Sequence, residues 1–570
     1  MSVKPHLPLI VQSDRTILLE VHNPLFEEAR HALAGFAELV KSPEYIHTYR
    51  ITPLSLWNAA SSGISAEDVL ASLEAYSKFG IPPTIAAQVR ETFARCGSIR
   101  MERRGDDLVL VGEDPLLMTD IMGYRSFQAY IDTVLSPTEY KLRDFARGPI
   151  KQELVKLGYP VQDLAGYAEG EACPVELRQT TLAGRTFGLR PYQQSAVDAF
   201  YQSGSVYGGS GVLVLPCGAG KTVIGLGAIN QIQRATLILT TNTTSVRQWI
   251  SEILDKTTVE PEMVGEYTGQ LKQVKPITVA TYQILTHHHK ETDEYPHLRL
   301  FSERDWGLII YDEVHLLPAP IFRMTASLQA RRRLGLTATL IREDGREEDV
   351  FSLIGPKRFE LPWRDLEDAG FIAQANCREI RLPISSKLRE AYAVATPQQK
   401  HRIAAENPQK VQVLKSLLDR HQSDRVLIIG QYIKQLESIA EQLGAPLITG
   451  KVPERERELL YQQFKAGKIN HLVVSKVANF AVDLPDANVA IQVSGTFGSR
   501  QEEAQRLGRI LRPKEGDNQA HFYTLVTRDT REQEFAAHRQ LFLIEQGYRY
   551  EVVDVDTDRF TFFQEHETYE

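Results

Sequence analysis

The stretch that decides the fold is Leu215-Pro216-Cys217-Gly218-Ala219-Gly220-Lys221-Thr222, which lies between the apolar runs Gly211–Leu215 and Val223–Leu226. This pattern predicts a buried strand, a glycine-rich loop and the start of a helix. Glycines let backbone N–H groups turn toward phosphate oxygens, and the start of a helix favours anions. We therefore expect the loop to hold the phosphates of ATP, with Lys221 on the β- and γ-phosphates and Thr222 on Mg²⁺.

One position of the loop departs from the strict pattern, because Leu215 stands where glycine is usual. Loops of the helicase type often lack that glycine, so the departure indicates a subclass. The alternative is a chance Gly-Lys-Thr turn, which the flanking strand and helix patterns disfavour. The candidate nucleotide ligands in the loop are Leu215, Pro216, Cys217, Gly218, Ala219, Gly220, Lys221 and Thr222.

A second strand pattern ends in two adjacent acidic residues. The apolar run Gly307–Tyr311 is followed by Asp312 and Glu313. We expect Asp312 to hold Mg²⁺ and Glu313 to polarise the water that attacks the γ-phosphate. Such a pair on its own is often a simple strand-end turn. Together with the phosphate loop, it predicts a catalytic site for ATP hydrolysis.

From residue 186 onward, apolar strand patterns alternate with helical ones, which is typical of doubly wound parallel sheets. A first series of strands is expected at 211–215, 235–241, 277–281, 307–311 and 334–337, and a second at 425–430, 471–475, 489–494 and 521–526. The expected fold class is therefore α/β, with two tandem RecA-like parallel-sheet domains that are joined near residues 362–370. Smaller α+β domains are expected to precede them.

The N-terminal part has a mixed pattern. Hairpins are expected at about 7–21 and 98–111, and helices at about 25–41, 53–62, 65–79 and 82–95. Ser65 and Asp68 have the spacing of a helix-capping box. Helices followed by a hairpin are typical of a winged helix, and a small α+β docking domain remains the alternative. Residues 120–185 are only weakly patterned.

Composition limits the class of protein. The chain has 570 residues, enough for three or four domains, and its net charge is −8. A basic groove on an acidic protein still permits nucleic-acid binding. Four widely spaced cysteines exclude a zinc finger or disulfide framework. The absence of a long apolar run predicts no membrane association, so we expect a cytoplasmic protein, or a nuclear one in a nucleated cell.

The Asp-Glu-Val-His box at 312–315 resembles the superfamily-two helicases. The resemblance implies that Arg190 and Gln193, in Leu-Arg-Pro-Tyr-Gln-Gln at 189–194, bind the adenine of ATP. It also implies that Thr243 and Thr281 lie in two segments that contact the nucleic-acid strand. Residues 336–339 (Leu-Thr-Ala-Thr) match the motif that connects the state of the nucleotide to the strand.

The second α/β domain carries the matching arginine motif, Gln-Arg-Leu-Gly-Arg-Ile-Leu-Arg at 505–512. Arg509 and Arg512 are three residues apart on a helical pattern and so share one face. Both are expected to reach the γ-phosphate, with Arg512 as the arginine finger. Gln505, and Asp483 in a segment that resembles the fifth helicase motif, are expected to bind the nucleotide.

Within that superfamily the chain resembles the XPB helicases of DNA repair and transcription. The resemblance depends on Arg342-Glu343-Asp344, on Phe-Ala-Val-Asp-Leu-Pro-Asp-Ala-Asn-Val at 480–489, on residues 503–509, and on Ile-His-Thr-Tyr-Arg-Ile-Thr at 46–52. It implies a DNA-dependent ATPase of 3′-to-5′ polarity. The length of the chain and its lack of long acidic or basic tails favour a bacterial or archaeal type. The resemblance also implies that Arg342, Glu343 and Asp344 contact DNA and act in strand separation. A nuclease or another repair protein is an implied partner.

The resemblance also suggests a division into domains. We expect an N-terminal domain at 1–120, a small damage-recognition-like domain at 121–185, RecA-like domains at 186–365 and 366–535, a thumb-like insertion at about 384–410, and a tail at 536–570. Three alternatives stay open: a duplex translocase or clamp that does not separate strands, an ATP-regulated scaffold subunit of a repair complex, and a motor that acts on RNA.

Overall fold

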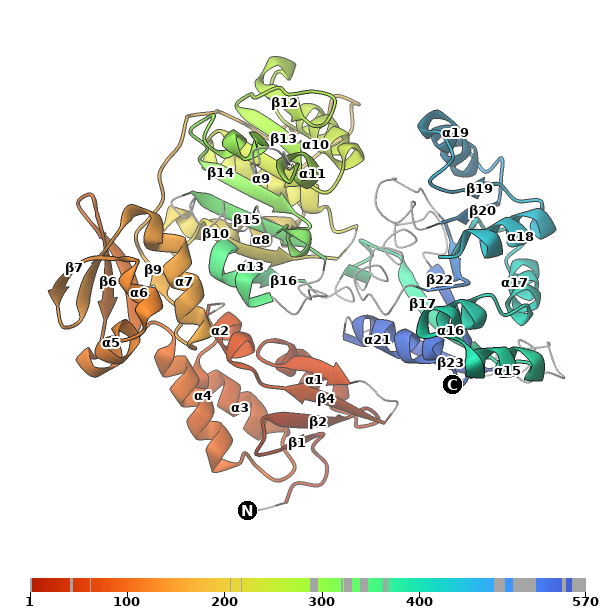
Figure 1. Ribbon diagram of the computed structural model, residues 1–570, viewed down its shortest axis with the longest axis horizontal. Coiled ribbons are helices and arrows are strands. Elements are labelled where there is room, and N and C mark those ends of the chain that lie inside the picture. Colours follow the sequence, from red (N-terminus) through yellow and green to blue (C-terminus); the bar gives the residue numbers. More distant parts are fainter. Residues whose placement is uncertain are drawn as a thin grey trace. The chain divides into compact units, whose positions relative to one another are not determined.

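The computed structural model (Figure 1) describes residues 3–41, 45–61, 63–205, 207–216, 218–287, 296–318, 321, 331–338, 347–361, 366–367, 369–475, 487–495, 519–545 and 550–555. The chain divides into two units. One contains residues 1–215 and 220–360, and the other contains residues 361–570 together with 216–219.

The first unit opens with an antiparallel sheet of order β1-β2-β4-β3. Its strands are β1 (Leu9–Val11), β2 (Thr16–Glu20), β3 (Glu38–Lys41) and β4 (Ile46–Arg50). Its helices are α1 (Phe26–Ala34), α2 (Pro53–Ser61), α3 (Ala66–Tyr76) and α4 (Pro83–Arg95). The first expected hairpin and the Ser65–Asp68 capping box are both present. The helix expected over 25–41 ends at Ala34, because the chain then joins the sheet as β3.

A five-stranded sheet of order β7-β8-β6-β5-β9 follows. It consists of β5 (Ile99–Arg104), β6 (Asp107–Gly112), β7 (Ile131–Ser136), β8 (Glu139–Leu142) and β9 (Gln162–Asp163). Helices α5 (Pro115–Met122), α6 (Arg125–Gln128) and α7 (Arg147–Lys156) contribute to its apolar core. The second expected hairpin, β5–β6, pairs with β8 and therefore belongs to this sheet. The break between the two N-terminal folds thus lies between α4 and β5, whereas the sequence suggested residue 120.

The third fold of this unit is a parallel sheet of order β12-β13-β11-β14-β15-β10-β16. Its strands are β10 (Ser210–Val214), β11 (Thr236–Thr240), β12 (Val264–Tyr267), β13 (Ile277–Thr281), β14 (Leu308–Asp312), β15 (Arg332–Thr337) and β16 (Lys357–Glu360). Helices α8 (Pro191–Tyr201), α9 (Lys221–Ile232), α10 (Thr243–Lys256), α11 (Tyr282–Leu285) and α13 (Glu347–Ile354) accompany it. Every residue of β10, β11 and β13 is buried, as expected for strands covered on both faces.

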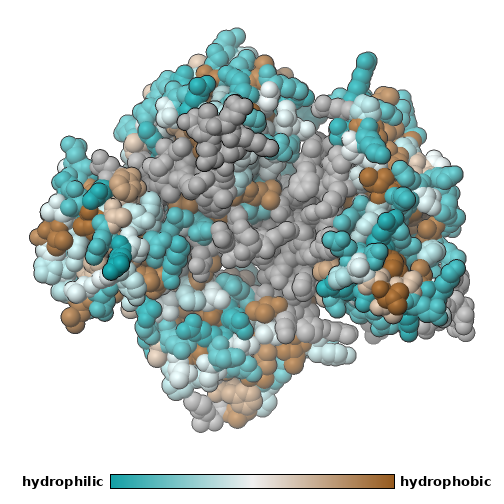
Figure 2. Space-filling model, viewed as in Figure 1, coloured by the Kyte–Doolittle hydropathy of each residue, from teal (hydrophilic) through white to brown (hydrophobic). Residues whose placement is uncertain are grey.

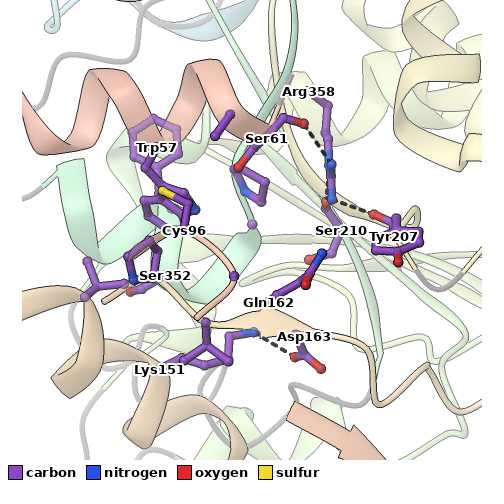
Figure 3. A pocket seen from close by; sticks show the side chains of 18 of the residues that line it. Trp57, Ser61, Cys96, Lys151, Gln162, Asp163, Tyr207, Ser210, Ser352 and Arg358 are labelled. Atoms are coloured by element: carbon purple, nitrogen blue, oxygen red, sulfur yellow. Dashed lines mark hydrogen bonds and ion pairs between the residues drawn. The ribbon is translucent and has the colours of Figure 1, made fainter. Parts of the chain in front are cut away.

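A cavity of about 520 Å³ lies where these three folds meet, lined by residues of α2, α7, β9 and α13 (Figure 3). Arg358 crosses the junction and donates hydrogen bonds to the backbone carbonyls of Ser61, Tyr207 and Ser210. Lys151 donates to Asp163 at 3.0 Å, and burial lowers the pKa of Lys151 to about 8. Buried polar contacts of this kind favour one arrangement of the packed elements.

The second unit is built on another parallel sheet, of order β19-β20-β18-β21-β22-β17-β23. Its strands are β17 (Gln374–Leu382), β18 (Val426–Ile429), β19 (Leu447–Ile448), β20 (His471–Val474), β21 (Val489–Gln492), β22 (Gln519–Thr527) and β23 (Tyr550–Asp554). Its helices are α15 (Ser386–Val394), α16 (Pro397–Ala405), α17 (Gln409–Arg420), α18 (Ile433–Leu443), α19 (Glu454–Lys465) and α21 (Arg531–Glu545). Two tandem parallel-sheet domains were predicted, and this fold class is confirmed.

Two expected boundaries of the second unit differ in the structure. The segment 536–570, expected as a tail, contains most of α21 and all of β23, which pairs with β17 and widens the sheet. The expected insertion at 384–410 consists of α15, which has no buried residue, and α16, which buries His401, Ala404 and Ala405. Its last residue, Lys410, belongs to α17 and is fully buried.

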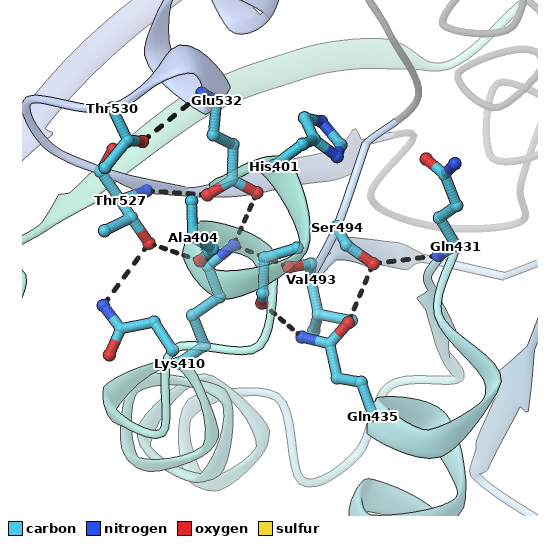
Figure 4. A network of polar contacts seen from close by, with 12 residues as sticks. His401, Ala404, Lys410, Gln431, Gln435, Val493, Ser494, Thr527, Thr530 and Glu532 are labelled. Atoms are coloured by element: carbon cyan, nitrogen blue, oxygen red, sulfur yellow. Dashed lines mark hydrogen bonds and ion pairs between the residues drawn. The ribbon is translucent and has the colours of Figure 1, made fainter. Parts of the chain in front are cut away.

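Lys410 is the centre of a buried polar network at the carboxyl end of the second sheet (Figure 4). Its ammonium donates to Glu532 at 2.7 Å and to the carbonyl of Val493 at 2.9 Å. Glu532 also accepts from the backbone N–H of Thr527 at 3.0 Å, so one ion pair joins α17, α21 and the ends of β21 and β22. Removal of one partner of such a pair leaves a buried charge uncompensated.

We therefore expect Lys410→Met to destabilise the second unit by about 3–5 kcal/mol. Hydrogen exchange of peptides over 487–495 and 519–527, measured on the intact chain, should accelerate accordingly. Arg402→Met is the matched control, because it breaks the ion pair between Arg402, on neighbouring α16, and Glu406. These two side chains are 49% and 30% exposed, so the loss of stability should stay below about 1 kcal/mol. Equal effects of the two variants would contradict this account of Lys410.

Candidate ATP site

An ion pair at the carboxyl end of the first parallel sheet joins two of the predicted catalytic residues. Lys221 is the first residue of α9, and Glu313 directly follows β14. The Lys221 ammonium donates to a Glu313 carboxylate oxygen at 2.6 Å. The two side chains are only 13% and 18% exposed. The structure therefore brings the phosphate loop and the acidic pair together, as the sequence predicted.

Burial and charge set the ionisation of the acidic pair. Burial and the neighbouring Glu313 carboxylate raise the pKa of Asp312 to about 6, although Lys221 and Trp249 act in the opposite direction. Burial also acts to raise the pKa of Glu313, but Lys221 and His315 outweigh it and hold that pKa below its ordinary value. Glu313 is accordingly the member of the pair that keeps its charge more readily.

The backbone and the next strand fix the position of Glu313. Its φ is +52°, in the left-handed region, where a residue with a side chain is strained. His315 lies 3.6 Å from the second Glu313 oxygen and shares a 2.7 Å hydrogen bond with the hydroxyl of Thr337. Thr337 ends β15 within the predicted Leu-Thr-Ala-Thr motif, so that motif is linked to Glu313 through one histidine.

Two buried aromatic side chains contact Asp312. The indole N–H of Trp249, on α10, donates to the Asp312 carboxylate at 2.9 Å, and the hydroxyl of Tyr282, on α11, donates to the Asp312 carbonyl at 3.0 Å. The Trp249 ring packs on α9 where Gly225 leaves room for it, since a Cβ there would lie 2.4 Å from the ring. Sequence reasoning missed both roles. The only signal was the position of each residue beside a predicted strand-contacting segment.

The phosphate loop depends on a glycine that no other residue can replace without strain. Gly220 has φ +77° and precedes α9, and a Cβ on it would lie 2.6 Å from the side-chain amide of Gln193. Gln193 is buried, and its carbonyl oxygen accepts from the backbone N–H of Arg190 at 2.9 Å. The segment expected to read adenine therefore lies directly against the loop expected to hold the phosphates.

Comparison with known proteins shows the family of the chain. The model for the ERCC3/RAD25/XPB C-terminal helicase matches residues 366–567. Models for a helicase conserved C-terminal domain and for the res subunit of type III restriction enzymes match residues 9–132 and 186–342. A DNA 3′-5′ helicase XPB of Kineococcus radiotolerans is 52% identical over 96% of this chain and 97% of its own length. The chain belongs to the XPB family of DNA helicases.

Two further relatives support the same assignment. A DNA 3′-5′ helicase XPB of Mycobacterium tuberculosis is 50% identical over 96% of this chain and 98% of its own length. The general transcription and DNA repair factor IIH helicase/translocase subunit XPB of Enterocytozoon bieneusi is 33% identical over 96% and 92%. The predicted family, and a DNA helicase as the class of enzyme, are thereby confirmed. ATP use follows from the family, whereas the ligands of ATP and Mg²⁺ stay predictions.

Four other predicted ligands lie in the phosphate loop itself, where Leu215, Pro216 and Ala219 are buried and Gly218 is exposed. The predicted ligands outside that set divide into three groups. Thr222, the second residue of α9, and Thr243, the first of α10, lie at helix starts and are partly exposed. Thr281 is only 3% exposed, and its hydroxyl caps α11 by accepting from the backbone N–H of Ile284, whereas neighbouring Gln283 is exposed. Outside the described residues lie Cys217, Arg342, Glu343, Asp344, Asp483, Gln505, Arg509 and Arg512.

None of the helices in the described residues is long and apolar enough to cross a membrane. Among the residues that are coloured in Figure 2, hydrophilic ones predominate, and the apolar ones form small separate groups.

Gly220→Ala tests the loop geometry. We expect this variant to lose nucleotide affinity by at least tenfold, because the added methyl group displaces Gln193 and strains the backbone. Gly269→Ala is the control, since that position has ordinary φ and nothing within 4 Å of the new Cβ. Equilibrium binding of a fluorescent ATP analogue, with thermal unfolding to check folding, measures both variants. Native affinity in Gly220→Ala would refute the assignment of this loop.

Proposed function

We propose that this chain hydrolyses ATP at the Lys221–Glu313 site and uses the energy to separate DNA strands with 3′-to-5′ polarity, in DNA repair. The observation that carries the proposal is the 2.6 Å ion pair between Lys221 and Glu313. Lys221 directly follows Gly220, whose positive φ forms the tight turn of the phosphate loop. Family membership supports the choice of DNA as substrate.

In the structure the Lys221 ammonium neutralises Glu313. We infer that the phosphates of ATP replace Glu313 as the partner of the Lys221 ammonium, because they carry more negative charge than one carboxylate. Glu313 then loses its partner and accepts a hydrogen bond from the attacking water. His315, which also lowers the pKa of Glu313, stays beside it and favours its ionised form. The same contact therefore keeps the site inactive without nucleotide and releases the base when nucleotide binds.

The donor set suits Mg²⁺, which prefers oxygen ligands. The Asp312 carboxylate and the Thr222 hydroxyl are the proposed ligands, and the N–H of Trp249 already orients that carboxylate. When bound, the ion would neutralise phosphate charge. Arg190 and Gln193 are proposed to bind adenine. From the second domain, Asp483 and Gln505 are proposed to bind the nucleotide, and Arg509 and Arg512 to stabilise the γ-phosphate, with Arg512 as the finger.

DNA is proposed to lie along the starts of α10 and α11 and along α15 and α16. Thr243 begins α10, and exposed Arg247 follows one turn later. The exposed helix α15 carries Lys387 and Arg389. Arg342, Glu343 and Asp344 are proposed to part the strands. Contacts of this kind bind the phosphate backbone of DNA. The affinity should therefore be independent of base sequence and should fall steeply as the salt concentration rises.

A protein partner and a cellular place are also proposed. One relative is named as a subunit of a transcription and repair factor. We propose a nuclease or another repair protein as the partner here, and the cytoplasm as the location.

Glu313→Gln provides the central test. The native chain should hydrolyse ATP faster with DNA than without it, and should unwind a duplex with a 3′ tail but not one with a 5′ tail. Glu313→Gln should lower the DNA-stimulated rate by at least 10²-fold while it keeps ATP binding, since it removes only the base. An absence of hydrolysis by the native chain would overturn the proposal, and stimulated hydrolysis without unwinding would indicate a duplex translocase.

The proposed grip on DNA has its own test. Lys387→Ala combined with Arg389→Ala should reduce DNA affinity and lower the slope of log K against log salt by about 0.9 for each lost phosphate contact. Lys415→Ala, an exposed lysine on α17, serves as the matched control and should bind DNA like the native chain. Fluorescence anisotropy across a salt series measures the slopes. Unchanged slopes would remove α15 from the proposed interface.

A further inference from the structure

Asp312 is held from two directions by side chains that the chemistry of ATP hydrolysis does not use. Trp249 holds its carboxylate at 2.9 Å, and Tyr282 holds its backbone carbonyl at 3.0 Å. The position of Asp312 therefore depends on two residues that lie outside β14. Glu313, in contrast, is held by Lys221 and His315.

Both contacts originate in elements that begin at the proposed DNA surface. Trp249 lies on α10, whose first residue is Thr243. Tyr282 is the first residue of α11 and directly follows Thr281 at the end of β13. Each of the two predicted strand-contacting segments thus sends one side chain to the same residue of the ATP site.

The burial of both donors makes these contacts hard to break. Trp249 is 1% exposed and Tyr282 is 4% exposed, so water cannot replace Asp312 as their acceptor. A buried donor that loses its acceptor costs about 1–3 kcal/mol. If α10 or the Thr281–Tyr282 turn moves, we therefore expect Asp312 to move with it, because breaking the hydrogen bond would cost more free energy.

Trp249 also contacts the helix that begins with Lys221. Its ring packs on α9 at Gly225, where any larger residue would displace it. A movement of α10 therefore reaches both sides of the ATP site, through the ring to α9 and through the N–H group to Asp312.

We propose that Trp249 and Tyr282 are positioning residues that couple DNA contact at the starts of α10 and α11 to Asp312, and so produce part of the DNA stimulation of ATP hydrolysis. This inference rests on the proposed function, because it assumes that these segments meet DNA. It adds a route to Asp312 that is separate from the Thr337–His315 link to Glu313.

The test uses Trp249→Phe, Tyr282→Phe and the double variant, all in the full chain. Tyr282→Phe removes only the hydroxyl that bonds to Asp312, whereas Trp249→Phe removes the indole N–H and also part of the ring that packs at Gly225. Two matched controls come from the same domain. Trp306→Phe removes an equally buried indole bond to the carbonyl of Leu300, and Tyr267→Phe removes a buried hydroxyl bond to His297.

Two measurements separate coupling from simple damage to the fold. The first is the ratio of ATPase rates with and without DNA. The second does not depend on turnover: it is the change in DNA affinity caused by a non-hydrolysable ATP analogue, which reports the free energy shared by the two sites. We expect the double variant to lower both ratios by at least about fivefold. The single variants should have intermediate effects, and both controls should keep the native ratios.

The outcomes also distinguish this inference from the proposed function. If the native chain shows no stimulation by DNA, the proposed function itself fails. If the native chain is stimulated and the Phe variants at 249 and 282 keep ratios equal to those of the controls, the coupling route is wrong and the two side chains serve packing alone. A loss of stimulation in Trp306→Phe of the same size would likewise contradict the proposal, because it would show general damage to the domain.

Discussion

A single ammonium–carboxylate contact organises the carboxyl end of the first parallel sheet. Lys221 and Glu313 are 2.6 Å apart and largely shielded from water, so their attraction is much stronger than that of an exposed pair. Three features surround this contact: the tight loop at Gly220, the strained backbone of Glu313 and the hydrogen bond between His315 and Thr337. None of these features indicates a site by itself. Their common role is to position the two charged groups of the ion pair.

The topology of the sheet explains why residues distant in the sequence meet there. In a parallel sheet all strands end at the same edge, and strands β10, β15, β14 and β11 are consecutive neighbours. The phosphate loop, the Thr337 motif, the acidic pair and the start of α10 follow these four strands in that order. The second unit repeats the arrangement, and its buried Lys410–Glu532 pair occupies the corresponding edge.

Much of the fold was predictable because strands covered on both faces form continuous apolar runs, as in Leu237–Leu239 and Val426–Ile429. The phosphate loop and the acidic pair were predictable because their chemistry requires particular residues at fixed positions. Other features depend on pairing between distant segments. Nothing near residues 38–41 or 550–554 shows that they join sheets, and Thr281 gives no local sign that its hydroxyl caps a helix. The hydrogen bonds from Trp249 and Tyr282 to Asp312 require coordinates for the same reason.

The place of β17 in the second sheet has a consequence for how the chain is made. This strand lies between β22 and β23, so the first of its two neighbours is synthesised only when residues 519–527 leave the ribosome. Until then the nine residues of β17 present unpaired backbone on both edges. In the first unit β10 waits in a similar way, because its two neighbours, β15 and β16, begin only at Arg332 and Lys357. During translation, the interval between β17 and β22 is therefore a period in which an unpaired strand can pair with the wrong partner.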